Sequence, residues 1–295
     1  MKAEFKTLVQ FLSYFKDEAT CRQYFESIRF AKGDFCPHCK HDKINRFANG
    51  IRYRCAKCKQ DFTIKTGTLF GESKIPLQKW FIAIYLLTSN KKGISSIQLA
   101  DHVGVTQKTA WYMDHRIREA LKQGNGKLFG TVEVDETYIG GKHLRKDGFR
   151  RKAVIMGMIE RGGKAKAFHV ESRQTHIMLG QIKKNIKPEA KIMTDEAHVY
   201  RKLPKLGYQW GAIKHGKKHW KYHDISTNNI ESFWALMKRG TVGTYHTMSK
   251  KHLQRYIDEF TYRFNNRELL KQAMFADVVR RVSKRGKMSY KLLTA

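Results

Sequence analysis

Apolar positions in the first part of the chain recur at helical intervals. Residues 1–30 and about 76–122 place apolar side chains three and four positions apart, which predicts helices in both stretches. Between them, residues 31–70 are rich in cysteine and turn-forming residues. The second helical stretch runs into Gln123-Gly124-Asn125-Gly126, which is the best candidate for a linker between domains.

After the linker the pattern becomes typical of strands. The predicted elements are strands over 130–138, 153–160 and 165–170, a helix that carries Ile182 and Ile186, and a short strand over 191–194. Several strands followed by a helix and a further strand favour a mixed α/β sheet. From about residue 228 the chain is predicted to be helical almost to its end.

The composition indicates a folded protein that binds a polyanion. The 295 residues leave room for two or three domains, and 41% of them are hydrophobic. Lys and Arg number 58 against 26 Asp and Glu, which gives a net charge of +32. Such an excess supplies salt-sensitive affinity for the phosphates of nucleic acid. The alternative is a basic surface that serves solubility alone.

No stretch of the sequence predicts a membrane segment. The longest wholly apolar run, Trp80 to Leu87, is far shorter than the roughly 20 residues that a membrane-spanning helix needs. The N-terminal residues lack the pattern of a cleavable signal, because polar residues such as Lys6 and Lys16 interrupt the apolar ones. We therefore expect a cytoplasmic protein.

Four cysteines form two pairs with the spacing of a zinc site. Cys36-Pro37-His38-Cys39 and Cys55-Ala56-Lys57-Cys58 are C-x₂-C knuckles with fifteen residues between them. Each knuckle brings two thiolates to one side of a tight turn, and a hairpin over 44–53 can bring the turns together. Cys36, Cys39, Cys55 and Cys58 then close a tetrahedral shell, which predicts a structural Zn²⁺.

The cysteines have other interpretations. Two disulfides are disfavoured because a chain without an export signal keeps its thiols reduced. His38 can in principle replace one of the four cysteines as a ligand. The fifth cysteine, Cys21, lies on the apolar face of a predicted helix, where we expect a small buried hydrophobic residue.

The stretch from Ser95 to Arg118 predicts two helices joined by a tight turn. The first ends at Val103, Gly104 occupies the turn, and Thr106 is a suitable N-cap for the second. The exposed start of the second helix carries Gln107, Lys108 and Thr109. A helix-turn-helix reaches the base edges of DNA from these positions. Many helical hairpins never touch DNA, but the zinc knuckles and the basic composition favour the DNA-binding interpretation.

Two predicted strands carry carboxylates suited to a divalent metal. Glu133, Asp135 and Thr137 share one face of the first strand, and the strand that begins at Lys191 ends in Asp195. Acids on separate strands of one sheet can converge on hard cations such as Mg²⁺, which prefer oxygen ligands. A pair of such metals can support phosphoryl transfer.

A third acid, Glu231, opens the next predicted helix. Asn228 precedes it by three residues, so the alternative is a capping box at the start of that helix. Lys238 follows seven residues later, close to two helical turns, and therefore shares the face of Glu231. Lys238 could hold a phosphate beside the metals.

Several segments match, in order, those of a known family. They are the CPHC and CAKC knuckles, TGTLF, PLQKWF, VEVDETYIGGK, TDEAHVY and TNNIESFWALMKRGTVGTYH. The last three are specific and sensibly spaced, and the likeness runs along nearly the whole chain. On these segments the chain resembles bacterial insertion-sequence transposases with an N-terminal zinc ribbon and an ISXO-like DDE catalytic domain, relatives of the eukaryotic Merlin elements.

The resemblance implies an RNase H-like catalytic domain and assigns its residues. The triad that would hold two Mg²⁺ or Mn²⁺ ions is Asp135, Asp195 and Glu231. Lys238 matches the basic position that often follows the glutamate, and with Arg239 it is expected to contact DNA. The neighbouring acids that the motif does not select are Glu133, Glu136 and Glu196.

Together with the patterns above, the resemblance predicts five segments. They are an N-terminal helical segment (1–30), a zinc ribbon (31–72), a helix-turn-helix DNA-binding region (73–123), an RNase H-like DDE catalytic domain (124–270) and a basic C-terminal helical tail (271–295). The fold class is therefore α/β, with two DNA-binding elements before the catalytic domain.

The implied function is that of a DNA transposase that binds the terminal inverted repeats of an insertion sequence. Water cuts the DNA by in-line attack without a covalent enzyme intermediate, and the freed 3′ hydroxyl then attacks target DNA. Bringing two ends together implies a homodimer or higher oligomer, associated with a prokaryotic nucleoid. The alternatives are an RNase H-like structure-specific nuclease, which cuts without joining, and a domesticated, non-catalytic DNA-binding regulator.

Overall fold

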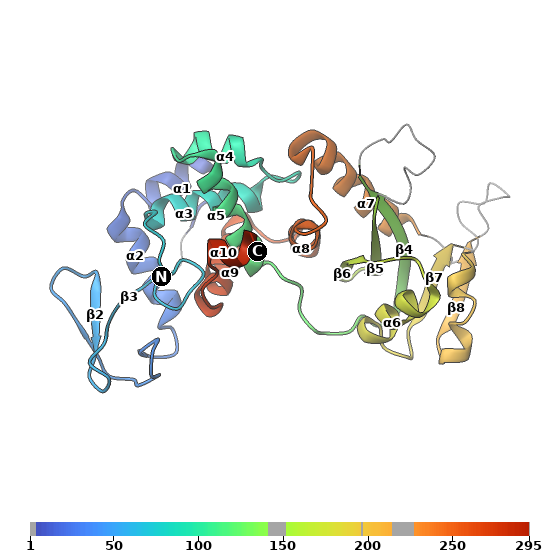
Figure 1. The fold of residues 1–295 in the computed structure, drawn as a ribbon, viewed down its shortest axis with the longest axis horizontal. Helices are drawn as coiled ribbons and strands as arrows, with labels where there is room; N and C mark the ends of the chain where they lie inside the picture. The colour runs from blue at the N-terminus through green and yellow to red at the C-terminus, as the bar shows by residue number, and fades with distance from the viewer. Residues whose placement is uncertain (1–3, 141–151, 196, 214–226, 295) are drawn as a thin grey trace. The chain divides into compact units, whose positions relative to one another are not determined.

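The chain divides into two compact units, which Figure 1 draws as a ribbon. The structure, a computed structural model, describes residues 4–140, 152–195, 197–213 and 227–294. Unit 1 consists of Met1–Leu121 and Glu268–Ala295, and unit 2 consists of Lys122–Arg267. The division falls directly before the segment that we proposed as a linker.

Unit 1 combines a small antiparallel sheet with a group of helices. The strands are β1 (Ile44–Arg46), β2 (Arg52–Cys55) and β3 (Asp61–Thr63). The helices are α1 (Leu8–Tyr14), α2 (Glu18–Arg29), α3 (Leu77–Ser89), α4 (Ser96–Val103), α5 (Gln107–Ala120), α9 (Lys271–Lys284) and α10 (Tyr290–Thr294). The hairpin predicted between the cysteine pairs is present as β1 and β2.

Helix α9 belongs to the core of unit 1. We predicted residues 271–295 as a basic tail of their own, but α9 packs against α2, α3 and α5. An apolar stripe on α9 explains the difference, because Met274, Phe275, Val278, Val279 and Val282 are all buried. The Phe275 ring lies 5.2 Å from the Phe81 ring and 5.3 Å from the Phe11 ring. Burial of these aromatic side chains joins the two ends of the chain in one core.

Unit 2 is built on a five-stranded mixed sheet. Its strands are β4 (Thr131–Ile139), β5 (Ala153–Glu160), β6 (Ala165–Val170), β7 (Lys191–Asp195) and β8 (Gln209–Ile213), in the order β6-β5-β4-β7-β8. The pairs β4–β5 and β5–β6 are antiparallel, whereas β4–β7 and β7–β8 are parallel. The predicted mixed α/β sheet is confirmed, although β8 was not among the predicted strands.

Helices cover both faces of this sheet. They are α6 (Thr175–Asn185), α7 (Asn228–Gly240) and α8 (Leu253–Asn265), with short helices over His198–Tyr200, Pro204–Leu206 and Thr241–Tyr245. Because side chains alternate along a strand, Val132 and Val134 pack towards α6, whereas Ile155 and Ile159 pack towards α7 and α8. Within the described part of the chain, no helix is long and apolar enough to cross a membrane.

Side-chain amides close the outer edge of the sheet at β6. The Ala165 N–H donates to Asn265 Oδ1 over 2.6 Å, and the Ala165 carbonyl accepts from Asn265 Nδ2 over 2.9 Å. Gln123 makes the same two-way pair with the backbone of Ala167, at 3.1 and 2.7 Å, and Gln254 also donates to Ala167. Unpaired groups on an edge strand invite pairing with another chain. These amides satisfy them and keep the edge closed.

Gly157 allows α7 to lie directly on the sheet. It occupies β5 opposite Asp135. A Cβ atom at this position would lie 2.6 Å from the Trp234 ring and 3.1 Å from Ile230 Cδ1. Since 2.6 Å is well inside van der Waals contact, α7 can pack at this depth only over a glycine.

A Gly157→Ala change should therefore destabilise unit 2. We expect the added methyl group to push Trp234 away and to lower the free energy of unfolding by about 1–3 kcal/mol. Hydrogen exchange of the β4 and β5 amides measures this unit by itself. Gly180→Ala is the matched control, because a Cβ on this residue of α6 meets no atom within 4 Å. The control should leave the same amides equally or better protected, and equal behaviour of both variants would contradict the packing argument.

Candidate active site and zinc centre

The four predicted cysteine ligands converge at one point of unit 1. Cys36 Sγ lies 3.7 Å from Cys58 Sγ, and Cys39 Sγ lies 3.5 Å from Cys55 Sγ. All four sulfurs are within 4.8 Å of one another. Zn–S bonds of about 2.3 Å in a tetrahedron place sulfurs about 3.8 Å apart. The cluster therefore fits a structural Zn²⁺, and the exposed His38 takes no part in it.

The two knuckles fold back in the same way. The Lys40 N–H donates to the Cys36 carbonyl over 2.9 Å, and the Lys59 N–H donates to the Cys55 carbonyl over 3.1 Å. Both lysines have left-handed backbone angles, with φ of 65° and 60°. A left-handed residue directly after each C-x₂-C pair reverses the chain and brings both thiols of the pair to one side.

The pKa of Cys55 differs from that of the fifth cysteine, Cys21. Burial raises the pKa of Cys55, but hydrogen bonds from the backbone of Cys58 and Lys57 outweigh it and lower the pKa to about 6. The lowered pKa favours the thiolate of Cys55, the form that binds zinc. For Cys58 the hydrogen bond from the Gln60 backbone lowers the pKa, but burial and hydrogen bonds with the neighbouring thiols raise it to about 12. Burial raises the pKa of Cys21 to about 12, so this fully buried thiol is a hydrophobic core residue, as expected.

Removing one zinc ligand should release the metal without disturbing the rest of the chain. We expect Cys58→Ser protein to lose the single equivalent of zinc that the wild type retains after desalting, as measured by mass spectrometry of the metal content. Loss of zinc should also expose the β1 and β2 amides to hydrogen exchange, because a closed zinc site contributes folding free energy. Cys21→Ala is the control and should keep its zinc. Zinc retention by Cys58→Ser would argue against the four-cysteine shell.

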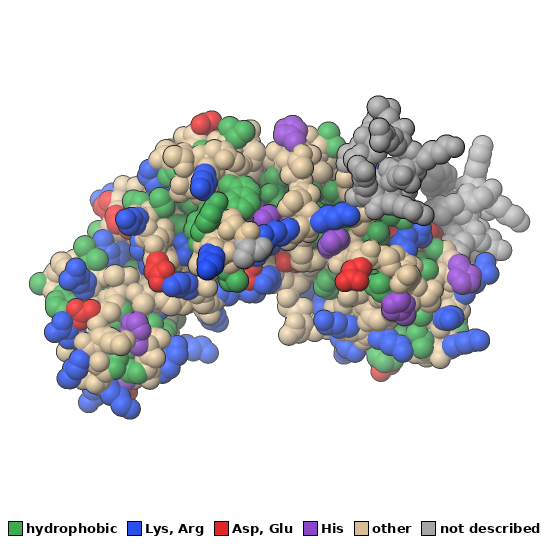
Figure 2. All heavy atoms as spheres, viewed as in Figure 1, with side chains coloured by type: hydrophobic (Ala, Val, Ile, Leu, Met, Phe, Trp, Pro, Cys, Tyr) green, Lys and Arg blue, Asp and Glu red, His purple; other side chains and the backbone are tan. Residues whose placement is uncertain are grey.

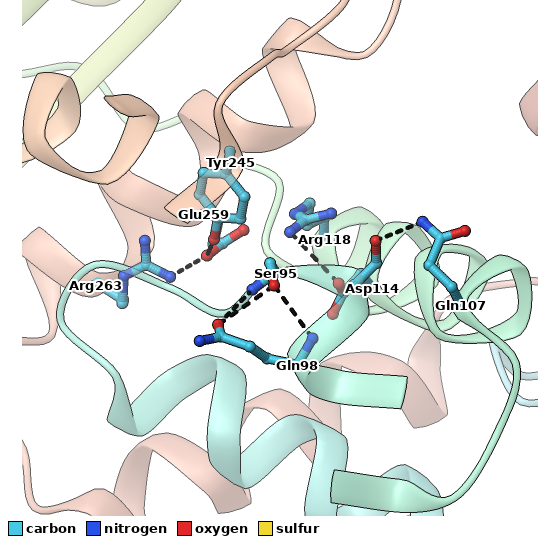
Figure 3. A network of polar contacts seen from close by, with 9 residues as sticks. Ser95, Gln98, Gln107, Asp114, Arg118, Tyr245, Glu259 and Arg263 are labelled. Carbon is cyan, nitrogen blue, oxygen red and sulfur yellow. Dashed lines mark hydrogen bonds and ion pairs between the residues drawn. The ribbon is translucent and has the colours of Figure 1, made fainter. Parts of the chain in front are cut away.

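Helices α4 and α5 form the predicted pair around a tight turn. Ser95 and Gln98 form a capping box at the start of α4, which Figure 3 shows. Gly104 ends α4 with a left-handed φ of 61°, and the Thr106 side chain caps α5 by accepting from the Thr109 N–H over 3.3 Å. Gly104 and Thr106 have the local roles that the sequence predicted, whereas the capping box of α4 was not predicted.

The start of α5 presents two of the three residues predicted to read DNA. Gln107 and Lys108 are exposed. Gln107 Nε2 donates to Ser96 Oγ over 2.8 Å, and Lys108 Nζ lies 5.2 Å from the centre of the Tyr290 ring. Thr109 is half-buried, and its hydroxyl lies 2.9 Å from that of Thr106. Thr109 therefore contributes to the cap and is less accessible than the other two.

Asp135 and Asp195 lie on one face of the sheet of unit 2. Glu133 on β4 is opposite Met193 on the parallel strand β7. Two residues further along each strand are Asp135 and Asp195, and side chains two residues apart share a face. The two carboxylates are close enough for the charge of Asp195 to raise the pKa of Asp135. The sheet thus brings the first two predicted acids together.

Glu133 fixes the start of α7 to β4. Its fully buried carboxylate accepts from the backbone N–H groups of Asn229 and Ile230 at 2.9 and 3.2 Å, and from Asn229 Nδ2 at 2.9 Å. Arg161 pairs with the same carboxylate at 3.1 Å. A carboxylate at a helix N-terminus satisfies free N–H groups and favours the helix dipole. Sequence reasoning considered Glu133 only as a metal ligand and missed this role.

Helix α7 presents Glu231, Lys238 and Arg239, all of them exposed. The Trp234 Nε1–H donates to Asp135 Oδ2 over 2.9 Å, so α7 lies on the face of the sheet that carries Asp135. The capping box with Asn228 is not formed, because Thr227 is the N-cap and its hydroxyl donates to Glu231 Oε1 over 2.9 Å. Glu231 is therefore available on the first turn of α7.

The three acids are not drawn together into one compact group. Among the described residues, only the four cysteines place three or more possible ligand atoms within 4.8 Å of one another. Asp195 Oδ1 accepts from the Ala197 N–H over 3.0 Å, and Glu231 turns towards Thr227. The elements that carry the three acids share a face of the sheet, but the Glu231 carboxylate is bonded to Thr227. Glu196, another acid considered from the sequence, lies outside the described residues.

Glu136 belongs to a network on the other face of β4. Tyr200 donates to its Oε2 over 2.5 Å, and Arg173 forms an ion pair with it. Burial raises the pKa of Glu136, against the opposing effects of Tyr200 and Arg173. The alternation of β4 predicts that Glu136 points away from Asp135, but no sequence signal identifies Tyr200 and Arg173 as its partners.

The segment after α7 is anchored to α8. Residues Thr241–Tyr245 form a short π-helix, and the Tyr245 hydroxyl donates to Glu259 Oε1 over 2.5 Å. Arg263 pairs with the same carboxylate (Figure 3). A buried carboxylate with two donors fixes the end of α7, as Glu133 fixes its start.

The carboxyl group of Asp135 has a raised pKa. Burial, together with the charges of Glu136 and Asp195, raises its pKa from 3.8 to about 6, against hydrogen bonds from the Glu136 backbone and Trp234. The folded state therefore binds a proton on Asp135 more tightly than the unfolded chain does. Its favourable contribution to stability is complete below about pH 4 and is lost as the pH rises through about 6.

An Asp135→Asn change should therefore stabilise unit 2 only above about pH 6. Without divalent metal, we expect a gain on the order of 1–3 kcal/mol at pH 7.5 and almost none at pH 4. Hydrogen exchange of the β4 amides, extrapolated across pH, measures the gain. Glu189→Gln, which removes an exposed carboxylate of the same unit, is the control and should show no such pH dependence. A gain of equal size at both pH values would mean that desolvation of Asp135 is not its cause.

Comparison with known families gives the class of the protein. Residues 127–265 match the model of the ISXO2-like transposase domain, and residues 16–61 match that of the transposase zinc-ribbon domain. The first match spans β4 to α8 and contains all three predicted acids. The protein is a transposase.

Two relatives refine this assignment. A protein of Halobacterium salinarum, described as an uncharacterized protein in transposable element ISH50, is 26% identical over 276 residues, which cover 84% of this chain and 91% of that protein. An uncharacterized transposase-like protein of Haemophilus influenzae is 28% identical over 103 residues, 35% of this chain and 82% of that relative. With the two domain matches, these relatives identify the chain as an insertion-sequence transposase with a zinc ribbon and an ISXO2-like domain. The family inferred from the sequence is confirmed, and the link to Merlin elements stays a prediction.

Proposed function

We propose that this transposase cleaves and joins DNA through Asp135, Asp195 and Glu231 on an RNase H-like sheet. The observation that carries the proposal is the common face of β4, β7 and α7. Asp135 and Asp195 each follow the paired residues Glu133 and Met193 by two positions on this face, and Glu133 and Trp234 hold α7 there. The sheet order, with three antiparallel strands followed by two parallel ones, supports the RNase H-like assignment.

The three acids would hold two Mg²⁺ or Mn²⁺ ions. Asp135, desolvated and beside Asp195, has the environment that a bound cation relieves, and carboxylate oxygens are the ligands that these cations prefer. Glu231 is exposed, and its hydrogen bond to Thr227 can be exchanged for a metal. When bound, such ions stabilise the attacking and leaving oxygens of phosphoryl transfer.

In each step of the reaction, one P–O bond forms while another P–O bond at the same phosphorus breaks. Water attacks the phosphorus at the end of the element, and the 3′ oxygen leaves and takes up a proton. The resulting 3′ hydroxyl then loses its proton as it attacks a target phosphodiester, and the target's own 3′ oxygen leaves. Lys238 and Arg239, exposed on the helix that carries Glu231, would neutralise DNA phosphates beside these acids.

The zinc ribbon and the α4–α5 pair would bind the terminal inverted repeats. Gln107 and Lys108 would reach base edges, with Thr109 beside them at the cap of α5. Lys and Arg side chains are spread over the visible face of both units, with few Asp and Glu among them (Figure 2). Pairing of two DNA ends would require a homodimer or a higher oligomer, acting on double-stranded DNA in the cytoplasm of a prokaryote.

Neutralising any one of the three acids should abolish catalysis but not DNA binding. We expect Asp135→Asn, Asp195→Asn and Glu231→Gln to lower cleavage and strand transfer by more than about 100-fold, since even supporting residues of a metal ligand reach this range. The assay uses a duplex with the element's own end, a target plasmid and Mg²⁺. Gel-shift binding of the same duplex should stay close to wild type, because unit 1 is unchanged.

Glu189→Gln is the matched control and should keep wild-type activity. Full activity of Glu231→Gln would remove Glu231 from the metal site. Cleavage without joining in the wild type would favour the structure-specific nuclease. DNA binding without cleavage, unaffected by Asp135→Asn, would favour the non-catalytic regulator.

A further inference from the structure

A cationic cavity opens in unit 1 beside the zinc centre. Its volume is about 610 Å³, and its walls come from the end of α2, the first cysteine knuckle and the last turns of α9. The charged residues that line it are Arg29, Lys32, Asp34, Lys40, Arg280 and Lys284. Five of these six are positive, and they come from two stretches that are distant in sequence, residues 29–40 and 280–284.

Arg29 is a buried cation for which the described residues provide no carboxylate partner. Only 8% of the Arg29 surface is exposed to solvent. Its guanidinium donates to the carbonyls of Ile64 and Thr66, while Nε is buried and makes no hydrogen bond within the described residues. Burial lowers the pKa of Arg29 only to about 10, so the charge persists at neutral pH. A buried charge is ordinarily compensated by an opposite one.

The single acid in the wall does not supply that compensation. Both oxygens of Asp34 accept from the guanidinium of Arg46, at 2.8 and 2.9 Å. Arg280 lies 3.8 Å from Asp277, which pairs more closely with Arg281 at 2.7 Å. The wall therefore keeps an excess of positive charge in a partly desolvated space, where attraction for an anion is stronger than at an open surface.

A purely structural explanation accounts for Arg29 alone. Its guanidinium clamps α2 to the chain after β3, and it lies 5.5 Å from the centre of the Phe35 ring. Those contacts use the donors and the face of the guanidinium but bring no negative charge. They also leave unexplained why Lys32, three residues after α2, and Lys284, at the end of α9, line the same space.

We propose that this cavity binds a backbone phosphate of the DNA that the transposase recognises. The proposal rests on the DNA-binding function proposed above. A phosphate group supplies the missing negative charge and accepts charge-assisted hydrogen bonds from guanidinium and ammonium groups. Because the wall includes the first cysteine knuckle, the contact would fix the position of the zinc ribbon on the duplex without reading its sequence.

The test removes the two lysines that do not take part in packing. Full-length, zinc-loaded Lys32→Gln/Lys284→Gln protein is compared with wild type in binding a fluorescein-labelled duplex of the element's end, from 50 to 300 mM KCl. We expect the affinity at about 100 mM salt to fall about 3- to 10-fold and the slope of log K against log salt to become shallower by about 1, as for one lost phosphate contact. Lys202→Gln/Lys205→Gln, which removes two exposed charges from unit 2, is the matched control and should keep the wild-type slope.

Replacing single phosphates of the duplex by uncharged methylphosphonates identifies which DNA phosphate makes the contact. One methylphosphonate at a time is placed along the duplex, and we expect one position to weaken wild-type binding but not binding by the double variant. A wild-type slope in the double variant, with no such position, overturns the proposal while DNA binding itself stands. Competition by inorganic phosphate, with that unchanged slope, would assign the cavity to a free anion instead. Absence of any salt-dependent DNA binding in the wild type would overturn the proposed function, and this site with it.

Discussion

The buried carboxylate of Glu133 holds the architecture of unit 2 together. A charge removed from water is costly unless hydrogen bonds and an opposite charge replace its hydration. Glu133 has both, from the first N–H groups of α7, from Asn229 and from Arg161. The interaction joins residues 96 positions apart, and it sets where α7 begins relative to β4. The position of Glu231 therefore depends on a carboxylate that does not itself need to touch a metal.

Two carboxylates on the same face of β4 thus lie in different environments. Glu133 accepts hydrogen bonds from the start of α7 and pairs with Arg161, whereas burial raises the pKa of Asp135, two residues later, despite its hydrogen bonds. Environment, not residue type, separates a structural acid from one suited to a cation. Gly157 maintains the difference, because it lets Trp234 lie over the sheet and shield Asp135 from water.

The features that the sequence predicted well are those with a local cause. The cysteine knuckles, the cap at Thr106 and the turn at Gly104 each follow from a few neighbouring residues, and the strands of β4 and β5 follow from alternation. The family resemblance then identified the three acids. The structure adds that their elements share a face of the sheet, whereas the detailed roles of the acids remain proposals.

The features that the sequence missed depend on partners far along the chain. An apolar stripe on α9 shows that some surface is buried, but it cannot show that Phe11 and Phe81 cover it. Strand β8 is short and lies at the edge, so its pattern is weak. Glu133 was a plausible metal ligand by chemistry alone, because the donors that satisfy it come from the start of a helix that the sequence could not place in space.

The buried charges of the two units differ in whether a residue of opposite charge accompanies them. In unit 2, Glu133 and Glu136 have arginine partners, and Asp135 is the acid whose environment still favours a cation. In unit 1, Arg29 is a buried cation that lacks a carboxylate partner within the described residues. A divalent metal and a DNA phosphate are the complements that we propose for these two groups. On these proposals, each uncompensated charge lowers the stability of the free protein, and binding of the metal or the DNA restores it. The same charges therefore favour assembly of the transposase with its substrate.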